Sequence, residues 1–274
     1  MGIWGNCTGF RQYSRQKGAK KMEKETYLKL WLQEEEQAHI HGWDFSHING
    51  KYEEEQDLPW NYRETVRYYL KPEQKLLDVE TGGGEFLLSL NHPCCNLAAT
   101  ENYPPNVELC RKKLLPLGID FQEADGGGRL PFPDESFDLI INRHGNFNPA
   151  ETARLLKKGG IFITEQVGAE NDRELVELLL SDVPDLPFPD QYLNIAEQNF
   201  RAEGLSIIKA EEAFRPIKFW DVGALVWFAR VIPWEFPGFC VKDCQENLYR
   251  AQELLEREGV IEGKIHRFLL VVQK

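Results

Sequence analysis

After residue 72, the chain alternates short apolar runs with segments whose apolar residues recur at helical spacing. This alternation is typical of βαβ units and predicts a mainly parallel sheet with right-handed crossovers. Strands are expected at residues 75–79, 96–101, 120–123, 137–142, 160–167, 205–214 and 267–272. Helices are expected around Val107, Cys110 and Leu114 and around Leu248, Ala251 and Leu255. The pattern therefore predicts an α/β fold with helices on both faces of the sheet.

Further segments complete the predicted organisation. Residues 1–21 mix Gly, Gln, Lys and Arg with few periodic apolar residues, which is typical of a flexible tail. Residues 22–70 predict a cap, first an amphipathic helix at residues 23–37 and then an aromatic-rich stretch without a regular period. Residues 71–274 predict one domain with a lid insertion near residues 182–200, where prolines disfavour helix and central strand. The aromatic residues at 219–239 are expected either to build core or to line the site.

Composition and charge limit the kinds of partner and the cell compartment that we expect for this chain. With 274 residues, of which 42% are hydrophobic, the chain can bury the core of one elaborated domain. Its 32 Lys and Arg residues against 44 Asp and Glu residues give a formal charge of -12, the wrong sign for binding phosphate backbones by bulk electrostatics. A nucleic-acid partner is disfavoured without being excluded. The sequence shows no apolar run that could cross a bilayer and no secretory segment, so we expect a cytoplasmic protein without a membrane partner.

The cysteine pattern argues against a metal site. The chain has six cysteines, and no pair of them has zinc-finger spacing. Vicinal cysteines and cysteines four residues apart suggest no disulfide framework either. We therefore expect reduced, structural thiols and no metal.

A glycine-rich turn follows the first predicted strand. Residues 76–88 run from an apolar strand into an apolar helix through a turn that contains Asp78, Glu80, Thr81, Gly82 and Gly84. Glycine lets the backbone turn tightly and approach a ligand without a Cβ in the way, at the edge where doubly wound folds bind small ligands. The alternative is a tight turn without a ligand, because a glycine cluster alone is a weak signal. A dinucleotide fingerprint requires a third glycine where this chain has Leu87, which disfavours a nicotinamide or flavin cofactor.

Polar residues also mark the ends of the next strands. Glu101, followed by Asn102, ends the second strand where a carboxylate can accept both ribose hydroxyl hydrogens, with a merely solvated acid as the alternative. Ala124 and Asp125 end the third strand, where the Asp can accept from an adenine amino group or simply form a turn. The fourth strand runs out at Asn142.

Together these motifs resemble the class I S-adenosylmethionine-dependent methyltransferases. The resemblance covers roughly residues 71–167 and rests on the order and spacing of Asp78-Val79-Glu80-Thr81-Gly82-Gly83-Gly84, Glu101, Ala124-Asp125, residues 130–140 and residues 155–160. It implies a Rossmann-like fold whose mostly parallel, seven-stranded sheet has an antiparallel last strand. The C-terminal pattern is similar to that of uncharacterised bacterial methyltransferases of the small-molecule type. Glu80 departs from the family, which usually has glycine there, and its carboxylate is a candidate acceptor for the methionine ammonium of the cofactor.

The resemblance also implies site residues. The cofactor would be S-adenosyl-L-methionine, bound by Asp78, Glu80, Thr81, Gly82, Gly84, Glu101, Asn102, Ala124, Asp125 and Asn142. Methyl transfer from a sulfonium needs mainly alignment and exclusion of water, so no universal catalytic residue is required. His144 is a candidate base, with a pocket-lining histidine as the alternative. Arg143 is a candidate for binding an anionic acceptor, with structural pairing to a nearby acid as the alternative.

Several functions remain open from the sequence. The acidic charge, the aromatic cap and the lack of a base-methylating motif after the fourth strand favour a small-molecule methyl acceptor. One alternative is an rRNA or tRNA methyltransferase whose local basic patch is hidden by the overall charge. Another is a catalytically inactive S-adenosylmethionine-binding module, motivated by Glu80 in the glycine turn. An NAD-dependent oxidoreductase is disfavoured by the missing third glycine.

Overall fold

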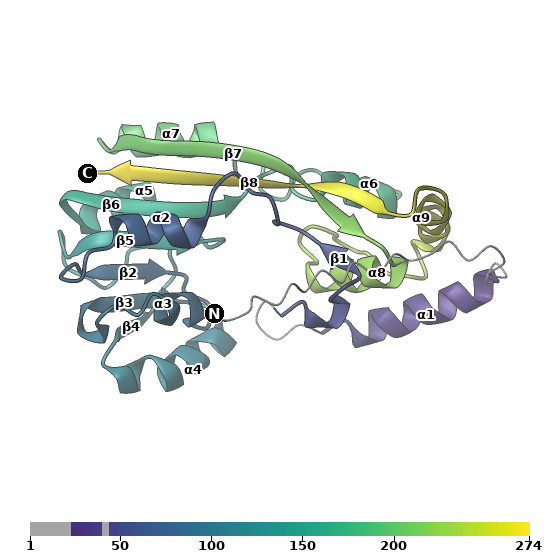
Figure 1. Ribbon diagram of the computed structural model, residues 1–274, viewed down its shortest axis with the longest axis horizontal. Helices are drawn as coiled ribbons and strands as arrows, with labels where there is room; N and C mark the ends of the chain where they lie inside the picture. Colours follow the sequence, from purple (N-terminus) through teal and green to yellow (C-terminus); the bar gives the residue numbers. More distant parts are fainter. Residues whose placement is uncertain (1–22, 40–43) are drawn as a thin grey trace, which may run out of the picture.

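An eight-stranded mixed sheet forms the centre of the molecule (Figure 1). The computed structural model describes residues 23–39 and 44–274, so the predicted tail at residues 1–21 lies outside the described residues. The strand order across the sheet is β1-β7-β8-β6-β5-β2-β3-β4. The strands are β1 (Tyr52–Glu53), β2 (Leu76–Val79), β3 (Leu97–Glu101), β4 (Asp120–Glu123), β5 (Phe137–Arg143), β6 (Leu156–Val167), β7 (Ser206–Phe219) and β8 (Ile261–Gln273).

The direction of the strands agrees with the predicted fold class. Strands β4, β3, β2, β5 and β6 run parallel to one another, and β8 is antiparallel to both β6 and β7. A Rossmann-like sheet with an antiparallel last strand is therefore confirmed. The eighth strand, β1, is an addition to the seven that were expected, and it pairs with β7 through only two residues.

Helices cover both faces because successive strand residues point to opposite sides. The helices are α1 (Lys24–Gln37), α2 (Tyr62–Tyr69), α3 (Glu85–Ser89), α4 (Pro104–Lys113), α5 (Pro149–Leu155), α6 (Arg173–Leu179), α7 (Leu193–Ala202), α8 (Val222–Val231) and α9 (Gln245–Glu258). Leu76 and Ile141 pack in one core with side chains of α2, α3 and α4. Their neighbours Leu77 and Ile140 pack in a second core with side chains of α5 and α7.

Strands β7 and β8 are longer than the sequence pattern predicted. The first of these strands was expected to end at residue 214 and the second to begin at residue 267, whereas the observed pairing extends to Phe219 opposite Ile261. Within this extension, Pro216 pairs with Lys264 of β8, while β1 pairs with β7 only at Lys218 and Phe219. Gly263 lets β8 pass close to Leu175 of α6, whose Cγ would lie 2.7 Å from an added Cβ.

The long strands carry a second lobe, formed by α1, α6, α8, α9 and the far ends of β7 and β8 (Figure 1). Helix α8 is buried along nearly its whole length, and Trp227 and Phe228 are among the large side chains in this core. The aromatic residues of 219–239 therefore mainly build core, as one of the two alternatives had it. The carboxyl ends of β2 and β6 point toward this lobe.

The predicted cap and lid segments are divided between the lobes. Helix α1 packs against α8, far along the sheet from the glycine turn, while residues 54–69 run beside the ends of β5 and β6. Residues 193–202 of the predicted lid form α7, and its Phe200 is buried in the sheet core. The second half of the segment predicted as a lid therefore belongs to the core beside the sheet. None of the helices in residues 23–39 and 44–274 is long and apolar enough to cross a bilayer.

Replacing Trp31 is expected to loosen the second lobe. Trp31 is 2% exposed, stacks on Tyr27 at 5.6 Å between ring centroids and lies 5.3 Å from the Tyr249 ring. Trp31→Ala should lower the free energy of unfolding in urea by about 3–5 kcal/mol, because a large buried ring leaves a cavity. Leu30→Ala on the same helix, where Leu30 is 45% exposed, should change it by less than about 1 kcal/mol. Equal effects of the two substitutions would show that α1 is not packed as described.

Candidate functional site

The glycine turn lies at the carboxyl edge of the sheet. After β2, the chain reaches α3 through three residues with positive φ, which are Glu80 at 57°, Gly82 at 63° and Gly84 at 78°. A Cβ at Gly84 would lie 2.9 Å from Leu114 Cδ2, so this glycine permits close packing of α4 against the turn. A Cβ at Gly82 would meet no atom within 4 Å. The space beside the Gly82 Cα is therefore open, which leaves room for a ligand to approach the backbone there.

The Glu101 carboxylate lies directly against this turn. Glu101 is 4% exposed, and its Oε2 accepts a hydrogen bond from the Gly82 amide at 2.7 Å. Its Oε1 accepts from the amides of Asn102 and Tyr103 at 3.0 and 2.9 Å. The structure thus brings together the two elements that the sequence placed on neighbouring strands, and the Asn102 side chain plays no part in holding the carboxylate.

Glu80 bridges from the end of β2 to the loop after β4. Its Oε1 accepts from the Gly126 amide at 2.6 Å. Gly145 makes room for it, because a Cβ there would lie 2.5 Å from Glu80 Cβ. The carboxylate therefore already has a backbone partner, and its expected contact with a cofactor ammonium stays a prediction.

Two of these acids have strongly perturbed protonation. Asp78 is buried and accepts from Thr81 Oγ at 2.6 Å; its burial, together with the charge of Glu101, raises its pKa to about 7. Burial also raises the pKa of Glu80 to about 7, and the charges of Glu101 and Asp125 act in the same direction. Four carboxyl groups thus converge on one sheet edge, an arrangement that favours a cationic ligand.

Asp125 behaves mainly as a turn residue. Its Oδ1 accepts from the Gly127 amide at 2.8 Å and its carbonyl accepts from Gly128. Ala124 donates its amide to the Glu101 carbonyl at 3.1 Å, which fixes this loop beside the glycine turn. The turn-forming alternative thus accounts for the observed contacts of Asp125, and a contact with adenine stays a prediction.

The buried Asn142 side chain links the ends of three neighbouring strands, β2, β5 and β6. It is fully buried, and its Nδ2 donates to the Val79 carbonyl at 3.0 Å, which ties β5 to β2. Its Oδ1 accepts from Thr164 Oγ at 3.1 Å and from Gln166 Nε2 at 2.5 Å on β6. These contacts give Asn142 a scaffold role, and direct cofactor binding by its side chain stays a prediction.

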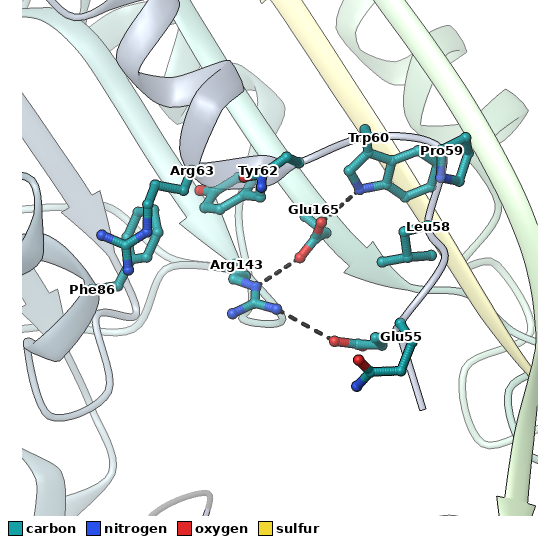
Figure 2. A pocket seen from close by; sticks show the side chains of 11 residues that line it. Glu55, Leu58, Pro59, Trp60, Tyr62, Arg63, Phe86, Arg143 and Glu165 are labelled. Atoms are coloured by element: carbon teal, nitrogen blue, oxygen red, sulfur yellow. Dashed lines mark hydrogen bonds and ion pairs between the residues drawn. The ribbon is translucent and has the colours of Figure 1, made fainter. Parts of the chain in front are cut away.

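Arg143 and Glu165 form a charged pair next to Asn142 (Figure 2). Glu165 is buried in β6, where its Oε1 accepts from Arg143 Nε at 2.7 Å and its Oε2 accepts from Trp60 Nε1 at 2.6 Å. Arg143 also reaches Glu55 at 3.5 Å. The predicted structural pairing of Arg143 with an acid is therefore present. Sequence reasoning overlooked Glu165, although an ionisable residue within an apolar strand was a usable signal.

His144 lies next to this pair but makes only a loose contact with it. Its Nε2 is 3.7 Å from Glu165 Oε1, and its side chain is 27% exposed. Desolvation lowers the pKa of His144 well below its usual range, and the charges of Arg267 and Arg143 lower it further. The imidazole is therefore neutral near pH 7, as a base requires, but it is not among the residues that line the neighbouring cavity.

A cavity of about 540 Å³ opens between α2, α3 and the ends of β5 and β6 (Figure 2). Its volume falls in the usual range for small-molecule sites. It is lined by Glu55, Gln56, Leu58, Pro59, Trp60, Asn61, Tyr62, Arg63, Phe86, Arg143 and Glu165. Of these, the sequence had singled out Arg143 as a site residue and the aromatic stretch that contains Trp60 and Tyr62 as a cap.

Comparison with known proteins bears on this geometry. A family described as "Methyltransferase domain" matches residues 77–164. These residues include the glycine turn, Glu101, strand β5 with Arg143, and most of strand β6. Residues 77–164 are thus similar to a methyltransferase domain.

Two relatives and a solved structure are similar to parts of this chain. The demethylmenaquinone methyltransferase of Thermus thermophilus is 33% identical over 118 residues, which cover 39% of this chain and 53% of that protein. The phthiotriol/phenolphthiotriol dimycocerosates methyltransferase of Mycobacterium tuberculosis is 31% identical over 110 residues, covering 38% of this chain and 40% of that protein. The chain thus spans about half, or less, of the length of the relatives it matches. A crystal structure of a proposed methyltransferase from Bacillus halodurans shares the fold, with a TM-score of 0.52, 18% identity, and coverage of 78% of this chain and 98% of that chain.

Stability of the methyltransferase domain is expected to depend on Glu80 titration. The folded-state pKa of Glu80 is about 7, above the ordinary value of 4.5 for a Glu side chain, so the native state holds a proton more tightly than the unfolded chain. Its contribution to stability is therefore complete at low pH and is lost as pH rises through about 7. Glu80→Gln keeps an acceptor for Gly126 but cannot ionise, so its free energy of unfolding relative to the natural protein should rise by about 2 kcal/mol between pH 5 and pH 8. Urea titrations at both pH values measure this, and a constant difference would contradict a shifted Glu80.

Proposed function

We propose that this chain is an S-adenosylmethionine-dependent methyltransferase that acts on a small-molecule acceptor. The observation that carries the proposal is the contact between the Glu101 carboxylate and the Gly82 amide at the carboxyl edge of a methyltransferase domain. It holds a carboxylate against the glycine turn, at an edge where a ribose and the chain of a nucleoside ligand could be bound together.

The residues at this edge fit such a cofactor. The two oxygens of Glu101 can accept from the two hydroxyl groups of a ribose. Asp78 and Glu80 add negative charge beside the turn, which favours a ligand with a net positive charge. When bound, S-adenosylmethionine supplies an electrophilic methyl group on a sulfonium. The acidic edge would therefore favour binding of the charged cofactor over its neutral-sulfur product.

The remaining residues would position the acceptor and exclude water. Trp60 closes one side of the cavity and is fixed by its bond to Glu165, while Tyr62 donates its hydroxyl to the Asn142 carbonyl at 3.0 Å. Alignment and desolvation of the two reactants supply much of the acceleration in such displacements. His144 is neutral but does not line the cavity. It could therefore remove a proton only from an acceptor that extended beyond the cavity, and its role as a base is a secondary part of the proposal.

The names of the relatives support a small acceptor. Demethylmenaquinone and the phthiotriol dimycocerosates are small molecules or lipids, and neither is a nucleic acid. The cavity of about 540 Å³ next to the proposed cofactor edge lies in the usual size range of small-molecule sites. The excess of acidic residues across the chain agrees with this choice.

Calorimetric titration with S-adenosylmethionine tests the cofactor. The natural protein should bind one equivalent, whereas NAD should not bind because the turn lacks the third glycine of a dinucleotide site. Glu101→Gln should weaken binding about tenfold or more, since it removes a charged acceptor from the ribose hydroxyls. Glu123 is a matched control, because it lies opposite Glu101 in register on β4 but is exposed and bonds to Arg111. Glu123→Gln should leave the affinity unchanged, and an equal loss in both variants, or no binding at all, would refute the assignment.

A further inference from the structure

The walls of the cavity combine two aromatic rings, those of Tyr62 and Phe86, with two arginines (Figure 2). The Tyr62 and Phe86 rings lie 5.1 Å apart between centroids, at an interplanar angle of 39°. Both rings contact a cation, because the Arg143 guanidinium lies 5.9 Å from the Tyr62 ring and that of Arg63 lies 5.3 Å from the Phe86 ring. A ligand in the cavity therefore meets aromatic carbon and guanidinium groups together.

The charged residues that line the cavity are two acids, Glu55 and Glu165, and two arginines, Arg63 and Arg143. Glu165 has a side chain that is 3% exposed, and both of its oxygens already accept bonds, from Arg143 and Trp60. Glu55 is held by Arg267 Nε at 2.5 Å. The Arg143 side chain, in contrast, is 42% exposed. The acids are thus compensated within the protein, while a guanidinium group remains accessible.

Arg143 retains hydrogen-bond capacity for a ligand. A guanidinium has five N–H donors, and the Nε bond to Glu165 uses one of them. Its approach to Glu55 at 3.5 Å is longer than a good hydrogen bond. Because Glu165 fixes the Nε side, the planar group is held in one orientation, which is the condition for paired bonds to a carboxylate.

We propose that the acceptor is a planar aromatic compound with a carboxylate group, that Arg143 binds this carboxylate, and that Tyr62 and Phe86 contact the ring. This inference rests on the proposed function, since it assigns the cavity to the methyl acceptor. Arg143 is then a specificity-determining residue, and Glu165 and Trp60 are positioning residues that act through it. Arg63 adds positive charge at the Phe86 end, where its Nη1 is fixed by Ser89 Oγ at 2.6 Å.

Three phenols that share a para-substituted ring and a two-carbon chain, but differ in the group at its end, test the proposal. These are 3-(4-hydroxyphenyl)propionate, which is an anion, 4-ethylphenol, which is neutral, and tyramine, which is a cation. Calorimetry with the full chain should show the anion binding about tenfold more tightly than the neutral probe, and the cation binding weakest. Equal affinities, a preference for tyramine, or no binding of the anion at millimolar concentration would overturn the proposal.

Variants of Arg143 separate specificity from folding. Arg143→Gln should weaken binding of the anion about tenfold and leave 4-ethylphenol unchanged, and Arg143→Lys should fall between because it keeps the charge but loses the planar fork. Arg67→Gln is the control, since Arg67 is an exposed arginine of α2 that pairs with Glu64 on the same helix. Arg67→Gln should change none of the three affinities. Loss of anion binding in both variants would refute a specific role for Arg143.

Titration of the same samples with S-adenosylmethionine keeps the two proposals distinguishable. If Arg143→Gln binds S-adenosylmethionine as the natural protein does, the fold is intact and its probe affinities report on the acceptor cavity alone. If S-adenosylmethionine binds while the probes show no charge preference, the aromatic acid is rejected and the methyltransferase assignment stands. If S-adenosylmethionine does not bind the natural protein, the proposed function itself fails.

Discussion

The bond from the Gly82 amide to the Glu101 carboxylate is the contact on which the site depends. It can form only because β2 and β3 are parallel neighbours, so that their carboxyl ends meet at one edge. It also requires positive φ at Gly82, which turns the amide toward the neighbouring strand. A side chain at Gly82 would strain this turn, and antiparallel pairing of β2 and β3 would separate the two groups by the length of a strand. The contact between the glycine turn and Glu101, on which the proposed cofactor site rests, thus follows from topology and backbone geometry together.

The site separates opposite charges across adjacent strands. Asp78, Glu80 and Glu101 gather on the β2 and β3 side, whereas Arg143 stands at the end of β5. Val79 lies opposite Asn142 in the β2–β5 register, so Glu80 and Arg143 are the next residues along the same edge. A cationic methyl donor and an anionic acceptor can therefore be bound side by side, each next to groups of opposite charge. Burial of Glu165 beneath Arg143 keeps that separation rigid.

Much of this arrangement could be predicted from the sequence, because it is encoded locally. Apolar runs, the glycine turn and Glu101 at a strand end indicate the parallel core and its binding edge. Helix α2 was missed because its aromatic residues hid the helical period, although Asn61 caps it by accepting from the Glu64 amide. The bond between Trp60 and Glu165 joins residues 105 positions apart, and such pairing has no local signature. The same holds for the second lobe, whose helices come from both ends of the chain.

A crystal structure of the protein grown with S-adenosylhomocysteine measures the central claim most directly. The adenosyl group is expected at the carboxyl edge of β2 and β3, with the Glu101 oxygens on the ribose hydroxyls and the sulfur directed toward the cavity beside Tyr62 and Arg143. A ligand bound elsewhere on the sheet would contradict it. So would a structure at saturating ligand in which the Glu80 side chain still occupies the expected cofactor position.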